Sequence, residues 1–298
     1  MKNKTQSILG CGFALITIMI WGTTFTSTKI LLLDFKPVEI LFFRFLLGYL
    51  ALFLACPRPL KLPSVRQEAV FALAGLCGIC LYYLLENIAL TFTMASNVSV
   101  IISVAPFFTV ILSQLLDSGE EKGKTGAHFF MGFVIAMAGI GLISFNGSRL
   151  ELNPAGDILA LMAAFVWACY SILSKKISSL GYPVLLTTRR TFFYGILFMV
   201  PALFFFDFQL RPERFGDITC LLNMVYLGLG ASALCFVTWN TAVRLLGAVR
   251  TSVYIYMVPV ITVATSALIL REPVTWISAA GTLLAVAGLF LSEYRGKG

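Results

Sequence analysis

The sequence has few charged residues and almost no histidine. Only 12% of its 298 residues are charged, and His128, at the start of a predicted span, is the single histidine. We find no metal-ligand cluster, nucleophile triad, phosphate-binding glycine loop or ATP-binding motif. These absences disfavour an enzyme and an ATP-driven pump, and we expect no cofactor and no bound metal.

The chain also lacks any polar or low-complexity stretch long enough to separate a soluble domain. Instead, 59% of the residues are hydrophobic and the mean hydropathy is +0.91. One soluble core cannot bury that much apolar surface, so we expect an integral membrane protein whose partner is the lipid bilayer. The formal charge of +8 then reflects membrane topology, and we expect no nucleic-acid partner.

The seven cysteines fall mostly within apolar segments, where a thiol behaves as a small hydrophobic group. Cys77 and Cys80 have the spacing of a redox or metal motif. They lie on a predicted membrane helix without a nearby histidine or second cysteine pair, so we interpret them as structural.

Apolar stretches of about 20 residues, the length that crosses a bilayer as a helix, follow one another with short interruptions. They predict an all-α polytopic membrane protein with ten transmembrane helices. The predicted spans are 8–32, 38–56, 68–92, 96–116, 126–145, 155–177, 184–206, 218–242, 251–270 and 275–293. The first apolar run has no small-residue cleavage site, so we interpret it as a retained span and not as a signal peptide.

The basic residues outside the spans predict the orientation, because Lys and Arg accumulate on the cytoplasmic side. With a cytoplasmic N-terminus, that side carries Lys2, Lys4, Arg58, Lys61, Arg66, Lys122, Lys124, Lys175, Lys176, Arg244, Arg250, Arg295 and Lys297. The opposite side carries only Lys29, Lys36, Arg149, Arg211, Arg214 and Arg271. Both termini are therefore expected in the cytoplasm.

The second half of the chain repeats landmarks of the first half. At a spacing of 146 positions, Trp21, Lys29, Pro37 and Arg44 match Trp167, Lys175, Pro183 and Arg190. At 153 positions Asn87 and Pro106 match Asn240 and Pro259, and at 149 positions Gly132 and Gly139 match Gly281 and Gly288. We therefore predict two five-helix repeats, residues 1–152 and 153–298, with the glycines allowing close packing of the last helix of each.

Five helices per repeat is an odd number, so the second repeat is expected to be inverted in the membrane relative to the first. Pro106 and Pro259 would break helices at matched positions. In secondary transporters, broken helices of inverted repeats hold the substrate near the middle of the membrane. The alternative is that each proline only kinks a packed helix.

Several motifs together resemble a known family. They are the Trp21-Gly22 pair, the Pro-x6-Arg pairs Pro37/Arg44 and Pro183/Arg190, the stretch LENIALTFTMASNVSVIISVAP, and the endings GFVIAMAGIGLIS and GTLLAVAGLFLS. In these the chain is similar to the EamA-type branch of the drug/metabolite transporter superfamily. The resemblance implies ten helices in two inverted bundles, a central cavity lined by the first four helices of each half, and export of amino acids, other metabolites or drugs. It also favours a bacterial inner membrane.

Arg44 and Glu86 are ionisable residues within predicted spans, where an unpaired charge is unfavourable. Both fall in the outer half of the membrane in the predicted topology. We hypothesise that they approach each other and gate the outer side. A permanent structural ion pair is the alternative. Glu86 is also the best candidate for proton coupling.

In the second repeat, Trp239 stands at the position that matches Glu86. Arg190 therefore lacks the carboxylate that we expect beside Arg44. We expect it to meet an aromatic ring, carbonyl groups, water or an anionic ligand, and one hypothesis is a substrate carboxylate. Arg189 should point about 100° away, toward the inner headgroups.

The remaining candidates for substrate contact are aromatic and amide side chains. The aromatic candidates are Trp21, Trp167, Tyr170, Trp239, Tyr254 and Tyr256, which either line a pocket or anchor the helices at the interface. The amides are Asn87, Asn97 and Asn240, which either bind substrate or bridge helices. Trp21 and Trp167 are the stronger candidates because both repeats retain them.

The sequence thus favours a secondary active transporter that exports small organic solutes such as amino acids by alternating access. An uncoupled facilitative transporter or a channel-like pore is the alternative, and a membrane enzyme or receptor has no supporting motif. Substrate identity, direction and coupling ion stay open.

Overall fold

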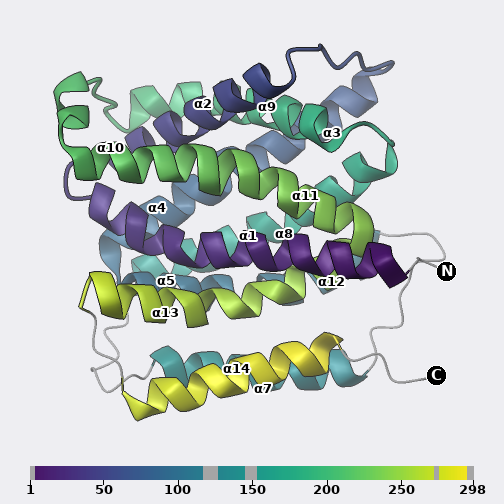
Figure 1. The fold of residues 1–298 in the computed structure, drawn as a ribbon, viewed down its shortest axis with the longest axis vertical. Helices are drawn as coiled ribbons and strands as arrows, with labels where there is room; N and C mark the ends of the chain where they lie inside the picture. The colour runs from purple at the N-terminus through teal and green to yellow at the C-terminus, as the bar shows by residue number, and fades with distance from the viewer. Residues whose placement is uncertain (1–3, 117–126, 145–152, 272–274, 294–298) are drawn as a thin grey trace.

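The computed structural model describes residues 4–116, 127–144, 153–271 and 275–293, and within these ranges the regular structure is entirely helical. Figure 1 shows the helices stacked with their axes roughly aligned, with α2 and α9 at one edge and α7 and α14 at the other. The prediction of an all-α protein is confirmed.

The helical elements follow one another with short connections. In the first half they are α1 (Lys4–Leu31), α2 (Pro37–Ala55), α3 (Val65–Gly75), η1 (Leu76–Leu81), α4 (Tyr82–Phe92), α5 (Ala95–Ile102), α6 (Ala105–Leu116) and α7 (Ala127–Ser144). In the second half they are α8 (Pro154–Ser179), α9 (Val184–Phe205), η2 (Pro212–Gly216), α10 (Ile218–Val225), η3 (Tyr226–Leu234), α11 (Cys235–Leu246), α12 (Ala248–Ser252), η4 (Val253–Met257), α13 (Val258–Ile269) and α14 (Trp276–Glu293).

Seven helical stretches of the described chain are long and apolar enough to cross a membrane. They are Thr5–Leu31, Pro37–Ala55, Val65–Phe92, Ala95–Leu116, Pro154–Ser179, Ile218–Leu246 and Ala248–Ile269. Shorter apolar helices cover Ala127–Gly139 and Leu283–Ser292. The predicted span 184–206 coincides with α9, which is not among the seven. The protein is therefore an integral membrane protein with several spans, and the count of ten stays a prediction.

Contacts between helix ends define two ends of the bundle. At the end that we call the Lys36 end, Lys36 pairs with Asp207, and Asn153 donates a hydrogen bond of 3.2 Å to the carbonyl of Phe92. At the opposite end, the Tyr182 end, Tyr182 donates to Gln67 over 3.2 Å. Helix α1 runs toward the Lys36 end, whereas α8 begins there and runs toward the Tyr182 end (Figure 1).

Two long helices contain wider, π-helical turns at corresponding places. η1 lies between α3 and α4, and η3 lies between α10 and α11. A π-helical segment shifts the hydrogen bonds of the backbone by one residue and is frequent at functional sites. In η3 the carbonyl of Ala231 accepts a hydrogen bond of 2.9 Å from Nε1 of Trp21. The widened turn thus connects the two halves of the chain.

The fourth and ninth predicted spans are interrupted beside their prolines. Ser103 and Val104 separate α5 from α6, and Pro106 is the second residue of α6. Pro259 is the second residue of α13, directly after the 3-10 segment η4. Proline is tolerated in a first turn because the backbone N–H that it lacks has no partner there.

Glycines let α7 and α14 pack with their backbones close together. A Cβ added to Gly288 would collide with backbone atoms of Ala136 and Gly132, and one added to Gly139 would collide with the backbone of Gly281 and Ala285. These are the glycines that the sequence predicted to pack closely. The α7/α14 pair lies at one edge of the bundle, next to η4 and α13 (Figure 1).

Candidate functional site

A layer of buried aromatic rings lies in the middle of the bundle. Trp21 and Trp167 meet edge to face with their ring centroids 5.1 Å apart. Trp239 packs against both, at 5.1 Å from Trp21 and 5.9 Å from Trp167. Phe236 contacts Trp21 at 5.7 Å. Three of the predicted aromatic candidates therefore form one cluster, which joins α1, α8 and α11.

On the side of this layer nearer the Lys36 end lies a cleft with about 390 Å³ of empty space, which we call the Glu86 cleft. Its lining comprises Trp21, Thr24, Phe25, Tyr82, Tyr83, Glu86, Ile102, Trp167, Ile255 and Val258. Glu86 is its one charged lining residue and is 1% exposed. Oε1 of Glu86 and Nε1 of Trp167 have no hydrogen-bond partner among the described residues. The cleft thus combines an incompletely bonded carboxylate with aromatic walls.

A second cleft, with about 340 Å³ of empty space, lies toward the Tyr182 end, and we call it the Arg244 cleft. Its lining comprises Tyr170, Ser174, Ile177, Ser178, Tyr182, Val184, Thr187, Thr191, Asn240 and Arg244. Oδ1 of Asn240 accepts hydrogen bonds from Tyr170 at 2.9 Å and from Ser174 at 2.7 Å, and Nδ2 donates to Thr188 at 3.1 Å. Asn240 therefore also bridges α8, α9 and α11.

The linings of the two clefts meet at the aromatic layer. Trp167, on the lining of the Glu86 cleft, contacts Tyr170, on the lining of the Arg244 cleft, with ring centroids 5.0 Å apart. Trp167 and Tyr170 are three residues apart on α8, so they occupy neighbouring turns of one face. A small movement of Trp167 and Tyr170 would therefore reshape the linings of both clefts.

Arg44 and Glu86 do not form the permanent ion pair that was the alternative to a gating role. Arg44 is fully buried, its Nε donates to Ser232 at 3.1 Å, and its guanidinium lies over the ring of Tyr83 at 4.4 Å. Its two terminal nitrogens have no hydrogen-bond partner among the described residues. The guanidinium instead meets the ring face of Tyr83, three residues before Glu86 on α4. The hypothesis that Arg44 and Glu86 gate the outer side stays a prediction. Both residues are buried, at 0% and 1% exposed.

Arg190 meets aromatic rings, as one of our expectations had it, with its guanidinium carbon 5.6 Å from the ring centroid of Phe193 and 5.4 Å from that of Tyr194. It also has an acidic partner that the sequence did not reveal. It forms an ion pair with Glu68, which also accepts a hydrogen bond of 2.6 Å from Tyr194. The carboxylate was missed because Glu68 comes from α3, which packs along α9, and not from the position that matches Glu86. Arg189 donates to the carbonyls of Cys56 and Arg58.

The other candidates lie outside the linings of both clefts. Asn87 donates to the carbonyl of Pro37 at 3.1 Å, and Asn97 donates to Asp157 at 3.1 Å, so both amides bridge helices. Tyr254 is buried in the main core, and Tyr256 packs in a separate cluster beside α7 and α14. Their role in substrate binding stays a prediction, because none of these four residues lines either cleft.

The sequence analysis missed much of the Glu86 cleft. Tyr82 stands one helical turn before Glu86, and Thr24 and Phe25 stand one turn after Trp21, so helical spacing from the named residues predicts the same face. Tyr82 is also placed to donate a hydrogen bond to Glu86. The i, i+3 and i, i+4 spacing from Trp21 and Glu86 was thus the sequence feature that could have identified these lining residues.

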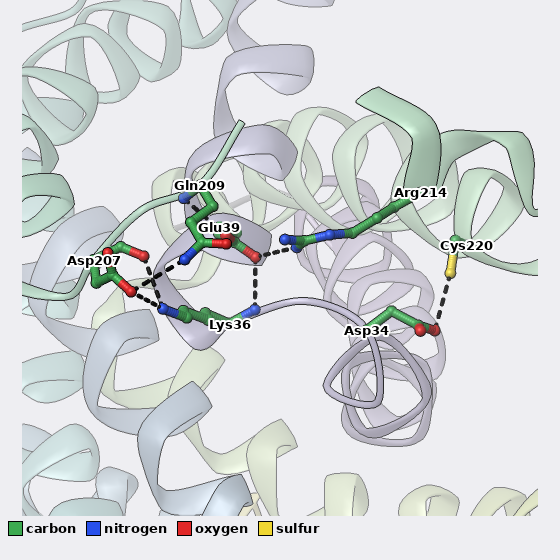
Figure 2. A network of polar contacts seen from close by, with 7 residues as sticks. All are labelled: Asp34, Lys36, Glu39, Asp207, Gln209, Arg214 and Cys220. Atoms are coloured by element: carbon green, nitrogen blue, oxygen red, sulfur yellow. Dashed lines mark hydrogen bonds and ion pairs between the residues drawn. The ribbon is translucent and has the colours of Figure 1, made fainter. Parts of the chain in front are cut away.

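A polar network joins the α1–α2 connection to the α9–α10 connection at the Lys36 end (Figure 2). Glu39 is fully buried, pairs with Arg214 at 2.6 Å and accepts backbone N–H bonds from Lys36 at 2.8 Å and Gln209 at 2.9 Å. Lys36 also pairs with Asp207, and its hydrogen bond and charge lower the pKa of that exposed carboxyl. The sequence analysis treated Lys36 and Arg214 only as topology signals, so it missed this network.

Comparison with known proteins identifies the family. The sequence model of the EamA-like transporter family matches residues 8–145 and again residues 154–294, which together make up most of the chain. The chain belongs to the EamA-like transporter family. The resemblance drawn from the sequence is thereby confirmed, and the protein is a membrane transporter and not an enzyme.

Several full-length relatives of this EamA-like transporter are described as transporters. An "Uncharacterized transporter" of Archaeoglobus fulgidus is 28% identical, covering 98% of both chains. A "Probable amino-acid metabolite efflux pump" of Escherichia coli is 26% identical, over 94% of this chain and 93% of its own. A "Probable terminal-alkyne amino-acid exporter" of Streptantibioticus cattleyicolor is 26% identical, over 95% and 93%.

One solved crystal structure has a similar fold. It superposes with a TM-score of 0.74 and 19% sequence identity, over 95% of this chain and 96% of that chain. At this identity the likeness shows the fold alone. It supports the arrangement of helices that positions the two clefts.

Proposed function

We propose that this EamA-like transporter is a secondary active transporter that exports small organic solutes, such as amino acids or other metabolites, by alternating access. The observation that carries the proposal is the pair of clefts on opposite sides of one aromatic layer. In alternating access a central site faces one side of the membrane and then the other. The Glu86 cleft and the Arg244 cleft would be the paths on the two sides of that site.

We also propose that the two halves, residues 1–152 and 153–298, are inverted repeats of five transmembrane helices each. The double match of one family model supports a duplication. The packing supports it too, because α1 packs on α11 and its counterpart α8 packs on α4. The opposite directions of α1 and α8 agree with an inversion.

Export is proposed from two relatives whose names contain the words efflux pump and exporter, both with amino-acid compounds. For orientation, we propose that the Tyr182 end faces the cytoplasm of a bacterial cell, with both termini there and the protein in the inner membrane. This orientation is supported by the excess of Lys and Arg at the Tyr182 end, which includes Arg58, Arg66 and Arg244.

Glu86 is our candidate for proton coupling, because it is the one charged residue on the lining of its cleft. Protonation makes a carboxylate neutral and so removes the large free-energy penalty of burying its charge inside a membrane.

Opening at the Lys36 end would separate or stretch the contacts of Glu39 with Arg214 and Gln209. That network, and not an Arg44–Glu86 ion pair, is our proposed closure of this end.

Transport by purified protein in proteoliposomes tests the proposal. A panel of labelled amino acids and amines is measured with and without an imposed proton gradient. A coupled transporter accumulates its solute above the external concentration when the gradient is present. Solute that only equilibrates, at the same rate with and without the gradient, would indicate an uncoupled facilitator or a channel-like pore instead.

A further inference from the structure

The chemistry of the Glu86 cleft indicates the class of solute that it binds. Glu86 is buried at the level of the central rings, and none of the described lysines or arginines forms an ion pair with it. An unpaired carboxylate in the membrane interior is unfavourable, because burial removes its hydration. The carboxylate of Glu86 therefore favours a ligand that carries a positive charge.

The walls of the cleft add a second attraction for a cation. Five aromatic side chains line it: Trp21, Phe25, Tyr82, Tyr83 and Trp167. Tyr82 and Trp167 lie with ring centroids 4.7 Å apart. Ring faces attract ammonium groups, most strongly when water is excluded, and they also pack against flat apolar groups. Carboxylate and rings together favour a ligand that is both cationic and apolar.

The same lining offers little to an anionic group. Arg44 is not part of it. Nε of Arg44 is bonded to Ser232 and its guanidinium lies over the ring of Tyr83, while its two terminal nitrogens have no partner among the described residues. The indole N–H of Trp21 is occupied by the carbonyl of Ala231, so the unpartnered indole N–H of Trp167 is a donor on the lining, and it carries no charge. A carboxylate brought into the cleft would lie near Glu86 without a cationic partner, which is unfavourable.

We propose that the Glu86 cleft binds organic cations, namely amines attached to an aromatic or similarly sized apolar group, in preference to zwitterionic amino acids. This inference rests on the proposed function, because it takes this cleft to be part of the transport site. The ammonium group would contact Glu86, and the apolar part would lie between the rings of Tyr82 and Trp167.

Three compounds with the same phenyl ring and a similar spacer test the proposal with the full-length protein in detergent. Phenethylamine is cationic, phenylalanine is zwitterionic and 3-phenylpropionate is anionic. Calorimetry should give phenethylamine a dissociation constant at least about tenfold lower than that of phenylalanine, and no binding of 3-phenylpropionate. Equal or tighter binding of either carboxylate compound would overturn the proposal, as would no binding of phenethylamine at millimolar concentration.

Two variants locate the binding. Glu86→Gln should weaken phenethylamine binding by roughly 10- to 100-fold, the effect of losing one hydrogen bond to a charged group. Glu213→Gln removes an exposed acid in η2 and should leave the affinity unchanged. Equal loss in both variants, or none in a folded Glu86→Gln protein, would contradict the assignment. If Glu86→Gln fails to fold, the comparison of the three compounds with the unmodified protein still tests the proposed ligand class.

Proteoliposomes separate this inference from the proposed function. Phenethylamine that binds through Glu86 but is not carried across the membrane would support the ligand class and contradict transport through this cleft. Phenylalanine that is carried while phenethylamine neither binds nor crosses would contradict the ligand class and support the transporter. Carriage of phenethylamine that is lost in Glu86→Gln would support both.

Discussion

Arg44 and Glu86 carry opposite charges deep inside the bundle, 0% and 1% exposed, yet no ion pair joins them. Tyr83 lies under the guanidinium of Arg44, with 4.4 Å between its ring centroid and the central guanidinium carbon, and also lines the Glu86 cleft. Each charged side chain keeps at least one polar atom without a partner among the described residues. This arrangement leaves Glu86 available to a proton or a ligand, and it distinguishes the site from a permanent structural ion pair.

Replacing Glu86 by Gln should abolish coupled transport without destabilising the fold. No ion pair is lost, and a buried charge with an unbonded oxygen is removed, so we expect an unchanged or higher melting temperature. Proteoliposome uptake and thermal unfolding in detergent measure the two effects, with Glu213→Gln as the control. Full coupled transport by Glu86→Gln would rule out both gating and proton coupling by this residue.

Arg214→Ala should destabilise the Lys36 end of the bundle. The change leaves the fully buried Glu39 with backbone donors but without its cation, which costs about 2 kcal/mol. Arg211, exposed on the same connection, provides the control, because Arg211→Ala removes a charge without removing an ion pair. Chemical denaturation of both variants gives the difference, and equal stability would contradict a structural role for the Glu39–Arg214 pair.

The Lys36–Asp207 pair predicts a pH dependence of stability. The hydrogen bond and charge of Lys36 lower the pKa of Asp207, so the native state favours the ionised carboxylate. The stabilisation is present above the pKa of the unfolded chain, about 4, and is lost as pH falls through the lower native pKa. Asp207→Asn suits the positive φ of 50° at this position. Its melting temperature should therefore lie below that of the wild type at pH 7 and approach it near pH 3.

A difference between the two proteins that stayed constant from pH 7 to pH 3 would contradict this account. The expected effect is small, because Asp207 is exposed and surface ion pairs contribute little. High salt should reduce the difference at pH 7, since solvent-exposed charges are screened.

Gly288→Ala should separate α7 from α14. The new Cβ would collide with backbone atoms of Ala136 and Gly132, which cannot move independently, and overpacking of this kind costs about 1–3 kcal/mol. Gly141→Ala is a matched control, because nothing lies within 4 Å of its added Cβ and alanine favours a helix more than glycine does. Thermal unfolding should show a lower melting temperature for the first variant only.

The membrane class and most helix positions followed from composition and apolar runs, because a bilayer dictates helix length. The sequence also identified Trp21, Trp167 and Glu86, since a repeated tryptophan and an acid within an apolar span are both visible in one dimension. All three line the same cleft. The i, i+4 relation of Tyr82 to Glu86 was also readable, but the analysis did not use it.

The pairing of side chains could not be predicted in the same way. The repeat spacing matches Arg44 with Arg190, but Glu68, which binds Arg190, comes from another helix, and only the packing of α3 on α9 brings it there. The Glu39–Arg214 pair joins residues 175 positions apart through two connections. The widened turns η1 and η3 also alter helix register in ways that residue spacing does not reveal.

Thiol labelling from both sides of the membrane tests alternating access most directly. In a cysteine-free variant that retains transport, Thr24→Cys places a single thiol in the Glu86 cleft and Ser178→Cys places one in the Arg244 cleft. An impermeant reagent is applied from each side, with and without a transported solute. We predict that the solute raises labelling at one position and lowers it at the other. Simultaneous, solute-independent labelling of both positions would indicate a continuous pore and contradict the account.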